Sequence, residues 1–383
     1  MLLSLLVLLS PDLTMAPIQA GQPTTRATLP LDAGDIWALR TVQTQPQADR
    51  RMAGSTIAVA VAPAASSFQA ALDAARTAAG AYGITFAAVR DGQVVWAGSS
   101  GTERDQRTRL TADSPMVIGS VTKTYVAATI LQLAEEGALD LDDSVRSHLP
   151  DLRPVSDKIT IRQLMNHTSG LADLFNEETR TGLEQHPERA WTAPEVMNSL
   201  HAPWYLPGEG WAYANTNYFV LGLIVERVTG NDLADELDRR FLAPLGLDAT
   251  RLLSASDPDS PLEPAWTTIF WASGAMSASA PDLARWGDAL YDDDILAFGS
   301  RRQMLRVNDD DYGLGVQRME LPRRIGYGHT GLLNTYTTLL VHLPADDVTI
   351  ALLVNRTHVD LMGMLMERPG RGQPPLLRLA TTR

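Results

Sequence analysis

Ser120 and Lys123 stand three residues apart in the segment Ser120-Val121-Thr122-Lys123, a spacing that could do chemistry. The chain contains 32 lysines and arginines, and only Lys123 and Lys158 are lysines. A buried lysine can lose its proton, whereas the guanidinium of arginine stays charged in proteins. A lysine at this spacing, in a chain that otherwise uses arginine, therefore indicates a base that activates the Ser120 hydroxyl as a nucleophile. The alternative is an exposed lysine on an amphipathic helix.

A helix is predicted to begin at Thr122 and to run to Glu136, where Gly137 ends it. Positions i and i+3 share one face of a helix, so Lys123 would lie beside the hydroxyl of Ser120. The unpaired N–H groups of the first turn would stabilise negative charge on the serine oxygen. For half of Lys123 to be neutral near pH 7, its pKa must fall by roughly 3 units, which takes about 4 kcal/mol and which burial could supply.

A second motif is Tyr213-Ala214-Asn215, which follows a turn and precedes an apolar helix. Tyr213 could pass a proton between Ser120 and a leaving group. Asn215 could donate its amide to Lys123 or to a substrate carbonyl. Taken alone, this motif is more typical of a half-buried loop tyrosine beside a turn asparagine.

A third motif, His329-Thr330-Gly331, lies on a predicted strand. Strand side chains alternate, so His329 and Gly331 share one face and Thr330 takes the other. The small Gly331 permits close approach of a ligand, and the strand could bind an acyl-peptide ligand as an added strand. Taken alone, this motif is more typical of a histidine held in a sheet.

The elements that must hold these motifs are predicted from the apolar pattern. Strands at both ends of the chain with helices between them indicate an α+β fold, with one antiparallel sheet flanked by helices and an inserted all-helical lobe. The folded domain is expected at 67–367 and the helical lobe at roughly 121–265. A cleft between lobes is the usual place for a small-ligand site. The predicted strands are 84–89, 94–97, 327–332, 336–343 and 348–354.

The three motifs also have a characteristic order. Tyr213 lies 93 residues after Ser120, and His329 lies 116 residues after Tyr213. This pattern resembles the serine β-lactamase and penicillin-binding hydrolase superfamily. The sequence is most similar to secreted D-alanyl-D-alanine carboxypeptidases, with class C β-lactamases and related esterases nearby. The resemblance covers about residues 70–365, and beyond the motifs it includes Leu131–Gly137, Ile159–Leu164, His167–Leu171 and Tyr312–Gly315.

The resemblance implies a role for each motif. Ser120 would be acylated, and Lys123 and Tyr213 would act as acid and base. The backbone N–H groups of Ser120 and Leu332 would form the oxyanion hole. The residues implied to position the substrate are Asn215, His329, Thr330, Gly331 and Leu332.

Some positions depart from the family pattern. His329 stands where class C β-lactamases have lysine, which weakens a lactamase assignment. Carboxypeptidase relatives often carry a carboxylate-binding arginine where this chain has Gln317, and strand alternation would point the next residue, Arg318, to the other face. Trp271, together with Phe270, is a candidate wall of the acyl pocket, although both are equally typical of a core.

The two ends of the chain are predicted to lie outside the domain. Residues 1–20 contain a short apolar run before Ile18-Gln19-Ala20 and predict a signal peptide, hence a secreted, periplasmic or extracellular protein. The alternatives are a misplaced start or a disordered tail in a cytoplasmic protein, because no cation precedes Arg26. Residues 21–66 are predicted as a disordered leader and 368–383 as a loose tail.

Composition removes several classes of function. The net charge of −13 argues against nucleic acid as a partner. The chain has no cysteine, its seven histidines form no metal-binding pair, and no apolar run is long enough to span a membrane.

We therefore expect a serine hydrolase without metal or organic cofactor. Its predicted reaction is carboxypeptidase-like cleavage of a small D-alanyl-D-alanine-type peptide amide. Hydrolysis of a β-lactam or an ester is the alternative within the superfamily. A non-catalytic protein that binds β-lactams or cell-wall peptide is the alternative outside it.

Overall fold

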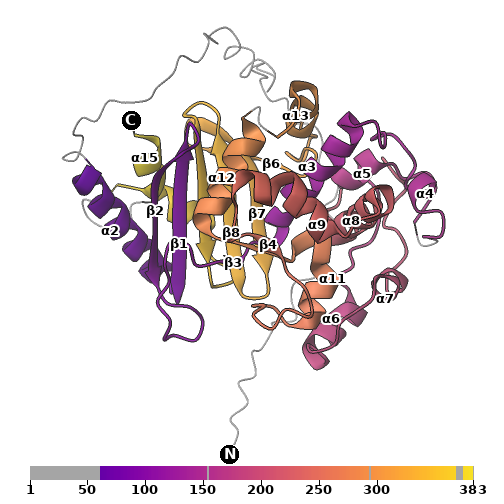
Figure 1. The fold of residues 1–383 in the computed structure, drawn as a ribbon, viewed down its shortest axis with the longest axis horizontal. Coiled ribbons are helices and arrows are strands. Elements are labelled where there is room, and N and C mark those ends of the chain that lie inside the picture. Colours follow the sequence, from indigo (N-terminus) through magenta and orange to yellow (C-terminus); the bar gives the residue numbers. More distant parts are fainter. Residues whose placement is uncertain (1–60, 153–154, 293–294, 368–373, 383) are drawn as a thin grey trace, which may run out of the picture.

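A six-stranded antiparallel sheet forms the centre of the computed structural model, which describes residues 61–152, 155–292, 295–367 and 374–382 (Figure 1). The strand order is β2-β1-β9-β8-β7-β6, so strands from both ends of the chain lie side by side. This arrangement confirms the predicted α+β class. The strands are β1 (Gly83–Arg90), β2 (Gln93–Gly101), β6 (Gln317–Leu321), β7 (Arg324–Leu333), β8 (Tyr336–Leu343) and β9 (Val348–Val354).

The pairing of β1 with β9 joins the two ends of the chain. β9 is buried at every position and β1 at all but its last, so each needs a neighbour on both edges and both faces. They pair antiparallel in a register that places Ala87 opposite Ala351. Asp91 and Gly92 connect β1 to β2 with φ values of 50° and 71°, as a two-residue hairpin turn requires.

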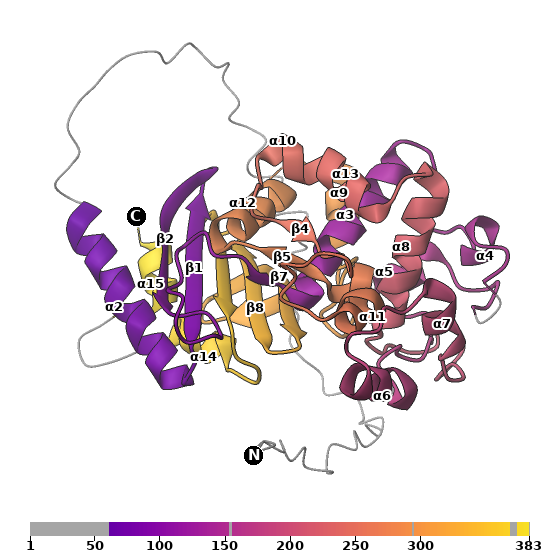
Figure 2. The same cartoon turned by 60° about the horizontal axis from the view of Figure 1, so that its bottom comes forward.

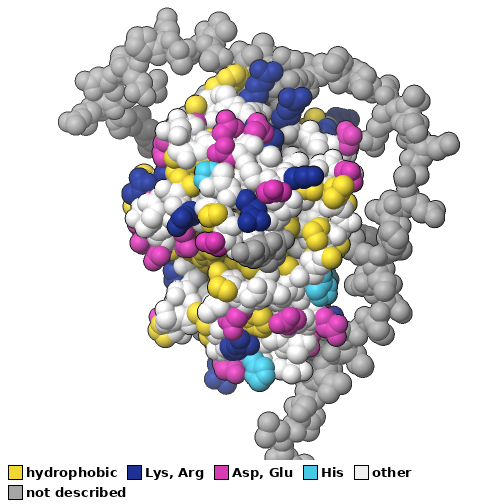
Figure 3. Space-filling view, turned by 90° about the vertical axis from the view of Figure 1, so that its right-hand side faces the viewer, with side chains coloured by type: hydrophobic (Ala, Val, Ile, Leu, Met, Phe, Trp, Pro, Cys, Tyr) yellow, Lys and Arg dark blue, Asp and Glu magenta, His cyan; other side chains and the backbone are white. Residues whose placement is uncertain are grey.

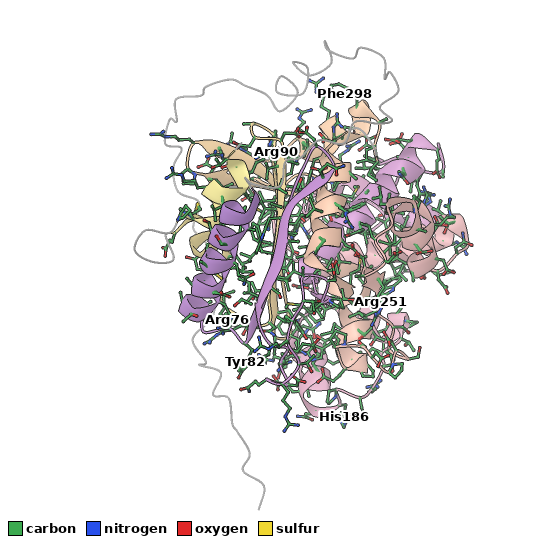
Figure 4. All side chains as sticks on the ribbon, turned by 60° about the vertical axis from the view of Figure 1, so that its left-hand side comes forward. Arg76, Tyr82, Arg90, His186, Arg251 and Phe298 are labelled. Atoms are coloured by element: carbon green, nitrogen blue, oxygen red, sulfur yellow. The ribbon has the colours of Figure 1, made fainter. Side chains whose placement is uncertain are left out.

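Helices from both ends of the described chain cover one face of the sheet (Figure 2). They are α2 (Val61–Ala79), α14 (Leu361–Met366) and α15 (Leu376–Thr381). Two arginines, labelled in Figure 4, attach α15 and α2 to the sheet. Arg90 of β1 donates from Nη2 to the Ala380 carbonyl at 2.8 Å, and Arg76 of α2 donates from Nε to the Ser100 hydroxyl of β2 at 2.9 Å.

These helices change the predicted limits of the folded region. Helix α2 begins at Val61, so residues 61–66, predicted as leader, are helical. Helix α15 lies within the predicted loose tail, and it is ordered because Leu376 and Leu377 are buried in the apolar layer under the sheet. The predicted signal peptide and residues 21–60 of the predicted leader lie outside the described residues.

The other face of the sheet carries α12 (Ala280–Tyr291), and beyond it lies the helical lobe (Figures 1 and 2). The region predicted as all-helical also contains the short strand β4 (Arg251–Leu252), which pairs with β5 (Met276–Ala278) beside β3 (Met116–Val117). The remaining helices are α3 (Thr122–Glu135), α4 (Val145–His148), α5 (Ile161–Met165), α6 (Glu177–Gln185), α7 (Ala193–Asn198), α8 (Asn215–Thr229), α9 (Leu233–Leu237), the π-helix Asp238–Leu242, α10 (Ala243–Leu245), α11 (Pro264–Gly274) and α13 (Phe298–Leu305).

Acidic and basic side chains are interspersed on the surface of the lobe seen in Figure 3. That face therefore presents no broad basic patch of the kind that binds nucleic acid. Within the described part of the chain, none of the helices combines the length and the apolar content that crossing a bilayer takes.

Helix α3 lies between the lobe and the sheet, and its burial holds the start of the helix in place. Eleven of its fourteen residues are buried. Tyr125 stacks on Trp286 of α12 with 3.9 Å between ring centroids, and Trp286 Nε1 donates to Thr124 Oγ1 at 2.8 Å. The first turn of α3 therefore has little freedom to move relative to the sheet.

Candidate active site

Ser120 lies in a single 3₁₀ turn, Gly119–Val121, that leads directly into α3. Strand β7 passes against this turn, and two glycines make the approach possible. A Cβ on Gly331 would lie 1.9 Å from the Ile118 carbonyl oxygen, and one on Gly119 would lie 2.8 Å from the Leu332 nitrogen. Gly119 also has a φ of 52°, which favours glycine. The serine is thus held between the start of a helix and the backbone of a strand.

Lys123 is fully buried one helical turn after Ser120. Its Nζ lies 3.0 Å from Ser120 Oγ, 2.8 Å from Asn215 Oδ1 and 2.7 Å from the Ser273 carbonyl oxygen. Burial lowers the pKa of Lys123 from 10.5 to about 7, although the negative charge of Asp173 acts to raise it. A substantial fraction of this amine is therefore neutral at physiological pH.

The three contacts of Lys123 Nζ decide where its lone pair points. A neutral amine has two hydrogens and one lone pair. Asn215 Oδ1 and the Ser273 carbonyl can only accept, so they take the two hydrogens. The lone pair is left for Ser120 Oγ, as a general base requires. Of the two roles suggested for the Asn215 amide, donation to Lys123 is not what the structure shows: Oδ1 accepts from Lys123, and Nδ2 donates to Asp173.

Tyr213 lies on the loop before α8, with its ring centroid 4.8 Å from Lys123 Nζ. Burial raises the pKa of its hydroxyl far above the usual range, although the neighbouring Ser120 hydroxyl acts to lower it. The hydroxyl makes no hydrogen bond of standard geometry to any described residue. This buried hydroxyl beside Ser120 can relay a proton, but it is not deprotonated in the resting protein.

His329 is buried in β7 and cannot supply a positive charge. Its Nδ1 lies 2.5 Å from the Thr330 carbonyl oxygen and its Nε2 lies 3.0 Å from the Tyr312 hydroxyl. The carbonyl can only accept, so Nδ1 carries the hydrogen and Nε2 accepts from Tyr312. Burial, reinforced by the charge of Lys123, lowers the pKa of His329 to about 3, so the ring is neutral at physiological pH.

A cavity of about 430 Å³ opens beside Ser120. Five of the residues proposed from the sequence line it: Tyr213, Asn215, His329, Thr330 and Leu332. Gly331 does not; it allows β7 to lie against the serine turn. The other lining residues are Trp211, Phe270, Ser273, Gly274, Gln317 and Leu333.

Two residues proposed for the site lie outside this cavity. The ring of Trp271 packs against that of Phe219 of α8, with 5.3 Å between the ring centroids, and does not line the cavity. Its neighbour Phe270 does. Arg318 is ion-paired with Asp311 at 3.0 Å and with Glu320 at 3.3 Å. Because side chains alternate along a strand, Arg318 points away from the cavity and Gln317 points into it.

Three contacts of the site were missed from the sequence. Ser273 acts through its backbone carbonyl, which no side-chain pattern reveals. Tyr312 was noted only within the family-like segment Tyr312–Gly315, yet its hydroxyl contacts His329. Asp173 follows the segment His167–Leu171, and only its contact with Asn215 shows its connection to the site. Among the described residues, no group of three or more His, Asp or Glu side chains is placed to hold a metal ion.

Comparison with known proteins gives a consistent assignment. The Beta-lactamase family model matches residues 68–366. Penicillin-binding protein 4* of Bacillus subtilis is 26% identical over 71% of this chain and 68% of its own length. D-aminopeptidase of Brucella anthropi is 27% identical over 70% of this chain and 55% of its own length. The crystal structure of a D-stereospecific amidohydrolase from Streptomyces sp. has a TM-score of 0.65 at 29% identity, covering 76% of this chain and 94% of its own. The chain belongs to the beta-lactamase family, whose fold is that of serine hydrolases that include penicillin-binding proteins and D-amino acid amidases.

Proposed function

We propose that this protein hydrolyses the amide bond on the carbonyl side of a D-amino acid, through an acyl-serine intermediate, and releases an amine without a free carboxylate, such as ammonia or the amide of a second amino acid. Ser120 Oγ attacks the substrate carbonyl carbon while its proton passes to Lys123 Nζ. The N–H groups of Ser120 and Leu332 hold the oxyanion. The C–N bond then breaks, and the proton returns through Lys123 and Tyr213 to the leaving amine. Water attacks the acyl ester by the same route and releases the acid, and Ser120 Oγ recovers its proton.

The observation that carries the choice of leaving group is the absence of a cation from the described lining of the cavity. No arginine is among the described residues that line the cavity, and His329 is neutral. A free carboxylate on the leaving group would therefore lack the charged partner that a carboxypeptidase needs.

Gln317 occupies the position where that partner would be expected. Its Oε1 accepts from both the backbone N–H and the hydroxyl of Thr330, at 3.0 and 3.1 Å. This fixes the amide orientation and leaves Nε2, which donates to no described residue, for a ligand in the cavity. An amide N–H suits a neutral carbonyl oxygen, so Gln317 favours a substrate whose leaving side carries an amide.

The printed names of similar proteins support the same class of substrate. A D-aminopeptidase and a D-stereospecific amidohydrolase are among them. Penicillin-binding proteins are also among them, so the carboxypeptidase predicted from the sequence remains the second candidate.

A matched pair of substrates distinguishes the two candidates. The pair is an N-acetylated peptide ending in D-Ala-D-Ala and the same peptide with a C-terminal amide. We expect kcat/KM to be about 10- to 100-fold higher for the amide, because a hydrogen bond to a charged group is worth about 1.5–3 kcal/mol and the described lining offers the carboxylate no positively charged partner. The Gln317→Arg variant should narrow or reverse the preference, and Arg318→Ala, whose side chain faces away, should leave it unchanged. A preference for the free acid in the unmodified protein would overturn the amidase assignment.

A second measurement tests the acyl-enzyme itself. Intact mass after incubation with a fluorescent penicillin should show one adduct, and Ser120→Ala should abolish both the adduct and amide hydrolysis. Undiminished penicillin affinity in Ser120→Ala, with no turnover in either protein, would identify a non-catalytic binder. Rapid turnover of the penicillin would instead favour a lactamase.

A further inference from the structure

Asp173 lies behind Asn215, on the side away from Lys123 Nζ, and holds it at both its backbone and its side chain. Asp173 Oδ1 accepts the Asn215 backbone N–H at 3.0 Å and the Phe175 N–H at 3.2 Å. Its Oδ2 accepts from Asn215 Nδ2 at 3.2 Å. Asn215 is the first residue of α8, so the Asp173 carboxylate caps this helix and also accepts a hydrogen bond from the side chain of its first residue.

The hydrogen bond from Asn215 Nδ2 to Asp173 fixes which end of the Asn215 amide faces Lys123. A carboxylate oxygen can only accept, so the NH₂ group must turn toward Asp173 and the carbonyl oxygen must turn toward Lys123. If the amide were reversed, its NH₂ group would donate to the lone pair of a neutral Lys123. That lone pair would then no longer face Ser120 Oγ.

We infer that Asp173 is a positioning residue of the reaction: its carboxylate sets the orientation of the Asn215 amide and thereby directs the Lys123 lone pair at Ser120. This inference rests on the proposed acyl-serine mechanism. The chain of contacts runs from Asp173 Oδ2 to Asn215 Nδ2, from Asn215 Oδ1 to Lys123 Nζ, and from Lys123 Nζ to Ser120 Oγ.

Asp173 also acts on Lys123 through its charge. The other titratable groups around Lys123 are His167, Tyr213 and Tyr218 from the lobe and His329 from β7. Burial lowers the pKa of both histidines and raises that of both tyrosines, so all four are uncharged at neutral pH. Asp173 is the acidic group that raises the pKa of Lys123, so its removal should lower that pKa further.

The Asp173→Asn variant separates positioning from general support of the fold. The new side chain would keep an oxygen for the Asn215 backbone N–H but would place its own NH₂ group against that of Asn215.

The rate of Ser120 acylation by p-nitrophenyl acetate is measured by stopped flow from pH 5 to pH 9, with the Ser120→Ala rate subtracted. We expect the plateau rate to fall roughly 10- to 100-fold, because the base is misaligned. The acid limb of the profile should move to lower pH, because the lysine loses the neighbouring charge.

Asp282→Asn is the matched control. Asp282 is buried and, like Asp173, accepts a backbone N–H, that of Ala249 at 2.9 Å; it also accepts from the Thr250 hydroxyl at 3.2 Å. It lies outside the cavity and does not act on the pKa of Lys123. The control should lower the unfolding temperature without moving the plateau rate or the acid limb. If Asp173→Asn is recovered unfolded, Asp173→Ser, whose hydroxyl can still cap the Asn215 N–H without charge, replaces it.

The outcomes separate this inference from the proposed function. If the unmodified protein shows no acylation above Ser120→Ala, the acyl-serine mechanism itself fails. If the unmodified protein is acylated and the Asp173 variant keeps its plateau, or loses rate with an unmoved acid limb, the positioning role is wrong.

Discussion

The burial of Lys123 should destabilise the folded protein by an amount that depends on pH, and this can be measured without knowing the substrate. The pKa of Lys123 falls from 10.5 to about 7 on folding. At about 1.4 kcal/mol per pKa unit, holding this amine charged in the folded state costs about 5 kcal/mol. The substitution that removes this cost is Lys123→Met, whose unbranched side chain is one heavy atom shorter and cannot be protonated.

The sign of the effect follows from the two pKa values. The folded value lies below the unfolded one, so the unfolded chain binds more protons between pH 7 and pH 10.5. The unmodified protein should therefore gain stability as pH rises through this window. The destabilisation due to Lys123 should be about 4 kcal/mol at pH 7 and about 2 kcal/mol at pH 9.

The assay is urea unfolding of both proteins at a series of pH values, followed by tryptophan fluorescence. Lys123→Met also loses hydrogen bonds to Asn215 Oδ1 and the Ser273 carbonyl, but that loss is nearly independent of pH. The informative quantity is therefore how the difference in free energy of unfolding between the two proteins changes with pH. We expect the advantage of the variant to shrink by about 2 kcal/mol from pH 7 to pH 9. Parallel stability curves would show that the amine keeps its ordinary pKa, and the proposed base would have to be abandoned.

Three further predictions concern the reaction. Lys123→Arg should lower the acylation rate about 10²- to 10⁴-fold, as much as Lys123→Ala, because guanidinium cannot accept the Ser120 proton; substantial activity in the arginine variant would exclude Lys123 as the base. In the unmodified protein the acylation rate should fall as pH drops through about 7, the pKa of Lys123, and a rate that is flat from pH 9 to pH 5 would contradict the mechanism. Gly331→Ala should slow acylation and lower stability by about 1–3 kcal/mol, because its Cβ would lie 1.9 Å from the Ile118 carbonyl oxygen; an unchanged acylation rate would show that this contact does not shape the oxyanion site.

Much of the architecture was predictable because it depends on local patterns. Five of the six strands of the main sheet were predicted from short apolar runs bounded by turn residues such as Asp91 and Gly92, and α3 from its apolar period and the glycine that follows it. Strand β6 was missed by this pattern, because Gln317–Leu321 contains no apolar run. Short elements escaped prediction. Strand β4 has only two residues, and helix α15 is stabilised by burial of Leu376 and Leu377 under the sheet. Such elements depend on distant contacts, which local propensity does not encode.

The closeness of Ser120 and Lys123 was predictable, because one helical turn brings residues three apart onto the same face. The contacts that give them chemical meaning come from distant segments. Asn215 and Ser273 accept the two hydrogens of the amine, and Asp173 orients Asn215. Burial beneath both lobes lowers the pKa of Lys123, and packing turns Trp271 and Arg318 away while Gln317 enters the cavity. Residue types and spacing along one helix indicate that Ser120 and Lys123 could react. The desolvation of Lys123 and the direction of its hydrogen bonds depend on the distant segments that the fold places around it.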